Sequence, residues 1–199
     1  MRAFIGITLP DAVRSSLASL QRYVGESSAD VKWVEPDNLH VTLKFLDEIT
    51  DEQRRYVEAL LGRIASAQPP FLLAMDRVGA FPAVTAPRVL WVGLSEGKES
   101  VIRIAESIER EGQAIPLPRE DLPAALRGAA QAGRPFAAHV TLGRVRTPRN
   151  RQALTERLRG VVWQPPAPWH VTSVTLYQSV LGATGPRYSV LADIPLGTK

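Results

Sequence analysis

The chain has 199 residues, a formal net charge of +4 and a sequence pI of about 9.8, which fits either an ordinary arginine-rich protein or one with an anionic partner such as a phosphate or RNA. It has no cysteine, which excludes disulfides, thiolate catalysis and the thiolate ligands of structural zinc sites. No apolar run is long enough to span a bilayer and no signal-peptide cleavage site follows the first strand, so we expect no membrane partner and, by default, a cytoplasmic location.

Hydrophobic periodicity and helix-stop signals predict alternating strands and helices. In chain order we expect a strand at 2–9, a helix at 12–24, strands at 31–34 and 39–46, a helix from Thr50 to the stop at Pro69, strands at 71–81 and 88–94, a helix at 98–111, a strand at 135–145, a helix from Thr147 to Leu158, and a hairpin of strands at 169–181 and 187–194. Residues 112–135 are predicted to form a loop or a short helix.

Three residues are expected to cap the helices. Asp11 is predicted to cap the first helix, and Thr50 with Gln53 three residues later has the pattern of a capping box. Thr147 precedes Pro148, which suits a first helical turn. These caps set the predicted helix starts.

The tetrapeptide HVTL occurs at 40–43 and again at 139–142, each time leading through a polar turn into an Arg-rich amphipathic segment. This internal repeat predicts two similar lobes related by a pseudo-two-fold axis. The third histidine, His170, begins the sequence HVTS but is followed by more strand-like sequence, so we interpret it as an incidental match.

The repeated motif places chemistry on one face of a strand. Side chains alternate along a strand, so the His and Thr of each motif project together, roughly 7 Å apart, while Val and Leu enter the core. Two opposed imidazoles can divide the work of acid and base, because histidine titrates near neutral pH. A threonine hydroxyl can donate to a non-bridging phosphate oxygen. We therefore expect His40, Thr42, His139 and Thr141 to handle a phosphoryl group without a metal or cofactor.

The stretches VKWVEPDNLHVTLKFL (31–46) and PFAAHVTLGRV (135–145) resemble the two signatures of the 2H phosphoesterases. The branch they resemble is the RNA 2′,3′-cyclic phosphodiesterases, also called 2′–5′ RNA ligases or LigT-like proteins. The resemblance implies an α+β fold of two pseudo-symmetric lobes, each an antiparallel sheet with helices on its outer face, enclosing a central cleft. We interpret residues 1–199 as a single bilobal domain.

The resemblance also implies a substrate and residue roles. The substrate is RNA or a nucleotide with a 2′,3′-cyclic phosphate end, which hydrolysis opens to the 2′-phosphate. His139 is assigned as the base and His40 as the acid, although the repeat leaves the reverse assignment open. Arg144 matches a phosphate-binding arginine; in a regular strand it would point away from His139, but Gly143 permits a bulge that turns it inward. Lys44 has the strand parity of His40 and is a second candidate for binding the anion.

Other functions fit the sequence less well. The segment GLSEGKES (93–100) is one residue short of a phosphate-binding loop, and no adenylation motif is present, which argues against an ATP-dependent ligase. Reversal of the hydrolysis, which joins a cyclic end to a 5′-hydroxyl, is expected as a minor activity at most. A noncatalytic RNA-binding module on the same fold remains the alternative, and no obligate protein partner is predicted.

Overall fold

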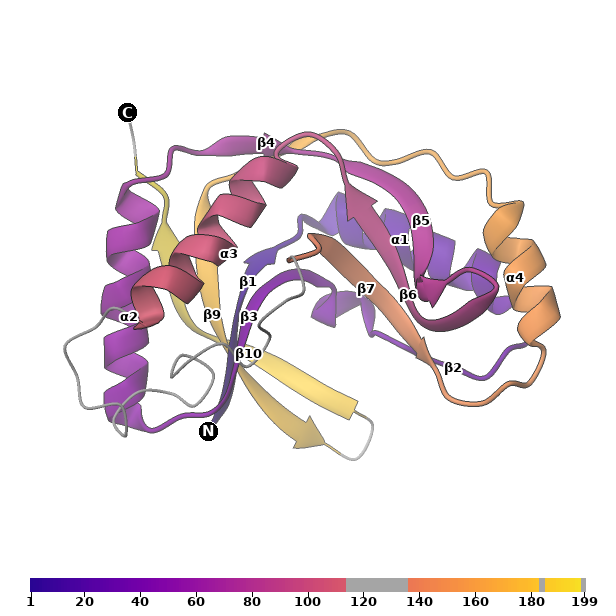
Figure 1. Cartoon of the computed structure of the whole chain (residues 1–199), viewed down its shortest axis with the longest axis horizontal. Helices are drawn as coiled ribbons and strands as arrows, with labels where there is room; N and C mark the ends of the chain where they lie inside the picture. Colours follow the sequence, from indigo (N-terminus) through magenta and orange to yellow (C-terminus); the bar gives the residue numbers. More distant parts are fainter. Residues whose placement is uncertain (114–135, 183–184, 198–199) are drawn as a thin grey trace.

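The computed structural model describes residues 1–113, 136–182 and 185–197. Within them the chain forms an α+β fold in which every strand pairing is antiparallel, as expected. The main sheet has the strand order β10-β9-β1-β3-β7-β6-β5, with β2 paired to β7. It divides into two lobes that meet where β3 pairs with β7 (Figure 1).

The first lobe contains the strands on the β3 side of this junction. Its strands are β1 (Arg2–Thr8), β3 (His40–Glu48), β9 (Ser173–Gly182) and β10 (Gly185–Pro195). Helices α2 (Asp51–Ser66) and α3 (Lys98–Gln113) pack beside it (Figure 1). Leu60, Leu61 and Ile64 of α2 are buried, which follows their helical spacing.

The second lobe contains the strands on the β7 side. Its strands are β2 (Val31–Trp33), β5 (Met75–Ala83), β6 (Ala86–Leu94) and β7 (His139–Val145). Helices α1 (Asp11–Gly25) and α4 (Arg151–Arg159) lie next to this lobe (Figure 1). A 3-10 helix, η1 (Pro36–Asn38), occupies the turn before β3. Both repeated motifs thus begin a central strand that leads into a helix of its own lobe, β3 into α2 and β7 into α4. The continuous sheet favours a single bilobal domain, which stays a prediction.

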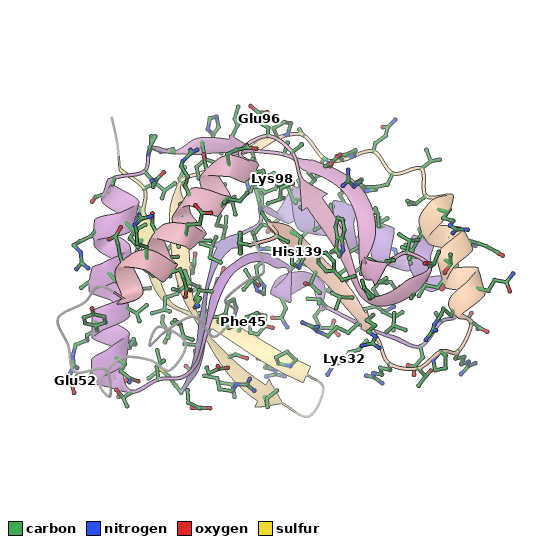
Figure 2. All side chains as sticks on the ribbon, in the orientation of Figure 1. Lys32, Phe45, Glu52, Glu96, Lys98 and His139 are labelled. Carbon is green, nitrogen blue, oxygen red and sulfur yellow. The ribbon has the colours of Figure 1, made fainter. Side chains whose placement is uncertain are left out.

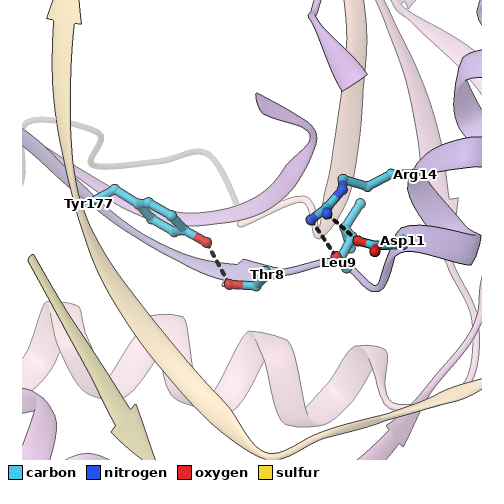
Figure 3. A network of polar contacts seen from close by, with 5 residues as sticks. All are labelled: Thr8, Leu9, Asp11, Arg14 and Tyr177. Atoms are coloured by element: carbon cyan, nitrogen blue, oxygen red, sulfur yellow. Dashed lines mark hydrogen bonds and ion pairs between the residues drawn. The ribbon is translucent and has the colours of Figure 1, made fainter. Parts of the chain in front are cut away.

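Two of the three predicted helix caps are wrong. Pro10, not Asp11, is the N-cap of α1, and Asp11 instead lies in the first turn, where its carboxylate pairs with Arg14 (Figure 3). The last helix begins at Arg151 after Asn150, which has a left-handed backbone, rather than after Thr147. The capping box of Thr50 and Gln53 is confirmed by reciprocal hydrogen bonds of 3.1 and 2.9 Å.

Two predicted strands are each divided in two. Ala74 interrupts the expected strand 71–81, and Thr172 interrupts 169–181, so that β4 (Phe71–Leu73) and β8 (Trp169–Val171) pair in a separate two-stranded sheet. His170 pairs with Leu72 in this small sheet and is exposed, in agreement with its interpretation as an incidental match. Residues 114–135 of the expected loop lie outside the described residues. None of the helices described here is both long and apolar enough to cross a bilayer.

Candidate active site

The two HVTL motifs lie side by side on the central strands. Val41 of β3 is the pairing partner of Val140 of β7, so the motifs run antiparallel about this pair. Both valines are fully buried, whereas the histidine and threonine beside each are only partly buried. Paired strand residues share a face of the sheet, so His40, Thr42, His139 and Thr141 all project from the opposite face. We call this the histidine face; Figure 2 labels His139 near the middle of the molecule.

Each imidazole is oriented by a backbone carbonyl two residues before it. His40 Nδ1 lies 2.7 Å from Asn38 O, and His139 Nδ1 lies 2.6 Å from Ala137 O. A carbonyl oxygen only accepts, so Nδ1 carries the proton in both rings and Nε2 is the atom that can exchange one. Thr42 Oγ1 lies 2.8 Å from His40 Nε2 and donates to it when the ring is neutral. The contact between Nδ1 and a carbonyl two residues earlier occurs in both motifs, as the repeat predicts.

Both motifs end in a β-bulge at their leucine. On β3, Thr42 pairs with Gly6 and Lys44 with Ile5, so Leu43 is the extra residue. On β7, Thr141 pairs with Trp91 and Gly143 with Leu90, which leaves Leu142 extra. An extra residue reverses the alternation of faces beyond it. The residue five positions after each histidine therefore returns to the histidine face.

This bulge has opposite consequences for the two predicted anion-binding residues. It turns Arg144 onto the histidine face, as the presence of Gly143 suggested. It turns Lys44 onto the other face with the buried Ile5, where its ammonium pairs with Glu109 of α3. The parity that led us to select Lys44 is therefore wrong.

Gly143 is required for this arrangement because the paired strand β2 lies too close to leave room for a side chain. A Cβ at this position would lie 2.8 Å from Val31 Cγ1, 3.0 Å from Trp33 Cε3 and 3.1 Å from Lys32 O. The side chain that follows is exposed, and its positive charge helps to lower the pKa of His139 and opposes the rise that burial causes in the pKa of Tyr188. The guanidinium of Arg144 thus acts on groups from both lobes.

Each histidine lies against aromatic side chains. His40 contacts Phe4, with ring centroids 4.6 Å apart, and the edge of Tyr188 at 5.4 Å. His139 contacts Phe81 at 5.3 Å and Trp91 at 6.4 Å. Burial is the main cause that lowers the pKa of both imidazoles below 6.5, and for His139 the charge of Arg144 lowers it further. In the free protein both rings therefore favour the neutral form.

A chain of hydroxyls supports the aromatic group around His40. Thr175 Oγ1 donates to Asp193 Oδ1 at 2.7 Å, so its own oxygen is left to accept from Thr8 at 3.1 Å. Thr8 Oγ1 then accepts from the Tyr177 hydroxyl at 2.5 Å (Figure 3). The Tyr177 ring stacks on Phe4 at 4.9 Å, and Phe4 contacts His40. The carboxylate of Asp193 thus sets the donor-to-acceptor direction of every hydrogen bond in this network, which ends at the Tyr177 hydroxyl. The Tyr177 ring supports Phe4, and Phe4 contacts His40.

The aromatic and hydroxyl residues around the histidines were missed by sequence reasoning. The aromatics Phe4, Tyr177 and Tyr188 come from β1, β9 and β10, and their contacts with His40 depend on strand pairing across the chain. Phe45 was also missed, although the repeat aligns it with Arg144 five residues after the histidine. No group of three or more potential metal-ligating side chains occurs among the described residues.

The sequence model of the LigT-like phosphoesterases matches residues 7–91 and 117–188, which is most of the chain. The chain belongs to the LigT-like phosphoesterase family. An RNA 2′,3′-cyclic phosphodiesterase of Aquifex aeolicus is 31% identical over 99% of this chain and 98% of its own length. The Escherichia coli protein of the same name is 30% identical over 96% of this chain and 93% of its own length.

Solved LigT-like structures have the same fold. A protein of Thermus thermophilus superposes with a TM-score of 0.78 at 30% identity, over the full length of both chains. E. coli LigT complexed with 3′-AMP gives a TM-score of 0.71 at 28% identity and covers 99% of this chain and 98% of its own. The resemblance noted in the sequence is therefore confirmed at the level of family and fold.

Proposed function

We propose that this protein hydrolyses the 2′,3′-cyclic phosphate at the end of RNA or of a nucleotide, and that the product is the 2′-phosphate. The observation that carries the proposal is the antiparallel pairing of β3 with β7 at Val41 and Val140, which puts two His-x-Thr motifs on one face. The names of the full-length relatives support the same substrate class. A cytoplasmic location stays a prediction.

In the proposed reaction, His139 Nε2 removes a proton from the attacking water as its oxygen bonds to phosphorus. The bond from phosphorus to O3′ breaks, its electron pair stays on O3′, and His40 Nε2 supplies the proton. Burial and the Arg144 charge both favour the neutral form of His139, which suits a base. Burial lowers the pKa of His40 as well, so its role as the acid follows only as the complement of the base role of His139.

The remaining side chains are proposed to hold the phosphate. The Thr42 and Thr141 hydroxyls donate to its non-bridging oxygens, and the exposed guanidinium of Arg144 offers charge-assisted hydrogen bonds. Lys44 was a second candidate for this role. Its ion pair with Glu109 and its place on the other face favour a structural role instead.

A dinucleotide with a cyclic phosphate end, incubated in excess EDTA, tests the proposal. We expect turnover to the 2′-phosphate, a loss of about 10²–10⁴-fold in kcat for His40→Ala and for His139→Ala, and an unchanged rate for His170→Ala as the matched histidine control. Tight binding without turnover would favour the noncatalytic RNA-binding module. Activity that disappears with EDTA would favour a metal site.

A further inference from the structure

The histidine face continues beyond His40 along β1 and β3. Thr8 pairs with His40 at one end of this ladder and Arg2 with Glu48 at the other, so it extends for roughly 20 Å at about 3.3 Å per residue. A cavity of about 200 Å³ lies along its outer half, lined by Arg2, Phe4 and Phe45 together with Leu181 and Tyr188 of the β9–β10 hairpin. Tyr188 and Phe4 also contact His40, so the cavity shares two of its lining side chains with the surroundings of this histidine.

Phe45 is the exposed aromatic surface of this cavity. The bulge at Leu43 returns it to the histidine face, in the position that Arg144 occupies after the second motif. Its side chain is 57% exposed, whereas Phe4, which lies between it and His40, is 2% exposed and offers no free ring face. Figure 2 shows Phe45 next to the hairpin of β9 and β10. An exposed phenyl ring beside a polar cleft is typical of a stacking platform for a base.

The charges around the cavity suit a phosphodiester. Arg2 is exposed, and its positive charge partly offsets the rise that burial causes in the pKa of Tyr188, so the guanidinium acts on the cavity wall nearest His40. Asp47 lines the same cavity, and because its carboxylate would repel a phosphate we expect the phosphate to lie next to Arg2. A phosphate between two nucleotides would thus lie between the Arg2 charge and the Tyr188 ring.

We infer that this cavity, the Phe45 subsite, binds the nucleotide that precedes the cyclic end of an RNA chain. The base of the reacting nucleotide is attached to the same sugar as the cyclic phosphate and stays next to His40. Phe45 is the second ring from His40, behind Phe4 at 6.1 Å, and therefore meets the preceding base, while Arg2 meets the phosphate that joins the two nucleotides. The inference rests on the proposed function and makes the enzyme selective for RNA ends over free cyclic mononucleotides.

The test compares a cyclic mononucleotide with a dinucleotide that carries the same cyclic end. The wild type is expected to have the higher kcat/KM for the dinucleotide. Phe45→Ala should reduce this advantage by about 5- to 150-fold and leave the mononucleotide rate unchanged, because one stacked base is lost. Phe45→Trp should retain the advantage, Arg2→Gln should reduce it in a salt-dependent way, and Val162→Ala, another exposed apolar side chain, should not affect it.

Equal kcat/KM for the two substrates in the wild type, or an equal loss for both in Phe45→Ala, would overturn the subsite. Binding of the two 2′-phosphate products, measured by calorimetry, separates this result from a failure of the proposed reaction. If neither substrate is hydrolysed but the dinucleotide product binds more tightly and loses this preference in Phe45→Ala, the reaction is refuted and the subsite is supported. If the two products bind equally, the subsite is refuted whether or not hydrolysis occurs.

Discussion

The close approach of β2 to β7 predicts that Gly143→Ala is destabilising. The added methyl would lie 2.8 Å from Val31 Cγ1 and 3.0 Å from Trp33 Cε3, and the third contact, at 3.1 Å, is a backbone oxygen that moves only with the strand. Forcing a methyl group into a packed site costs about 1–3 kcal/mol. For a chain of this size each kcal/mol shifts the melting temperature by about 2–4 °C, so we expect a decrease of about 2–12 °C.

The matched control is Gly62→Ala in α2. A Cβ at Gly62 meets nothing within 4 Å, and the residue is exposed in the interior of the helix. Alanine there should raise the free energy of unfolding by up to about 1 kcal/mol through helix propensity alone. Differential scanning calorimetry should therefore show opposite shifts for the same substitution at the two glycines.

The Gly143 variant also tests the position of Arg144. Displacement of β7 at the bulge should move the guanidinium away from the phosphate, so KM for the cyclic substrate should rise more than kcat falls. A Gly143→Ala protein with the melting temperature of the wild type would refute the packing argument. If the melting temperature falls as expected but KM is unchanged, the role of the bulge in placing Arg144 is refuted.

Burial lowers the pKa of both His40 and His139 in the free protein, so the form with one protonated and one neutral ring is most abundant below pH 6.5. A plot of kcat/KM against pH should therefore be bell-shaped with its maximum below pH 6.5. A maximum above pH 7.5 would contradict the assignment of the two histidines as acid and base. Because both pKa values are lowered by folding, the unfolded chain binds more protons than the folded chain as the pH falls through 6.5, so the free energy of unfolding should decrease over this pH range. The decrease should be less steep in His40→Gln. Urea denaturation at several pH values measures it, and the same pH dependence in the wild type and in His40→Gln would contradict the lowered pKa of His40. Thr175→Val removes the link between Asp193 and Thr8 and should cost about 1–3 kcal/mol, whereas Thr175→Ser, which keeps the hydroxyl, should not; chemical denaturation compares the two.

The bulges explain both what succeeded and what failed in the sequence interpretation. Strand alternation correctly put His40 with Thr42 and His139 with Thr141, because only one residue separates the members of each pair. Beyond the leucine the same rule failed for Lys44, since an extra residue in β3 reverses the faces. Gly143 signalled the bulge in β7, but no glycine marks the one at Leu43 of β3. The repeat itself was the available signal, because a bulge after one motif implies a bulge after the other.

The sequence by itself determined the local chemistry of this protein: which strands carry the histidines, which residues on them are buried, and the capping box that begins α2. These features depend on neighbours a few residues apart. Only the tertiary structure decided the pairing of Val41 with Val140, the aromatic surroundings of His40 and the separate sheet that contains His170. Those contacts join strands from distant parts of the chain, and their register is set by core packing and bulges that no local pattern encodes.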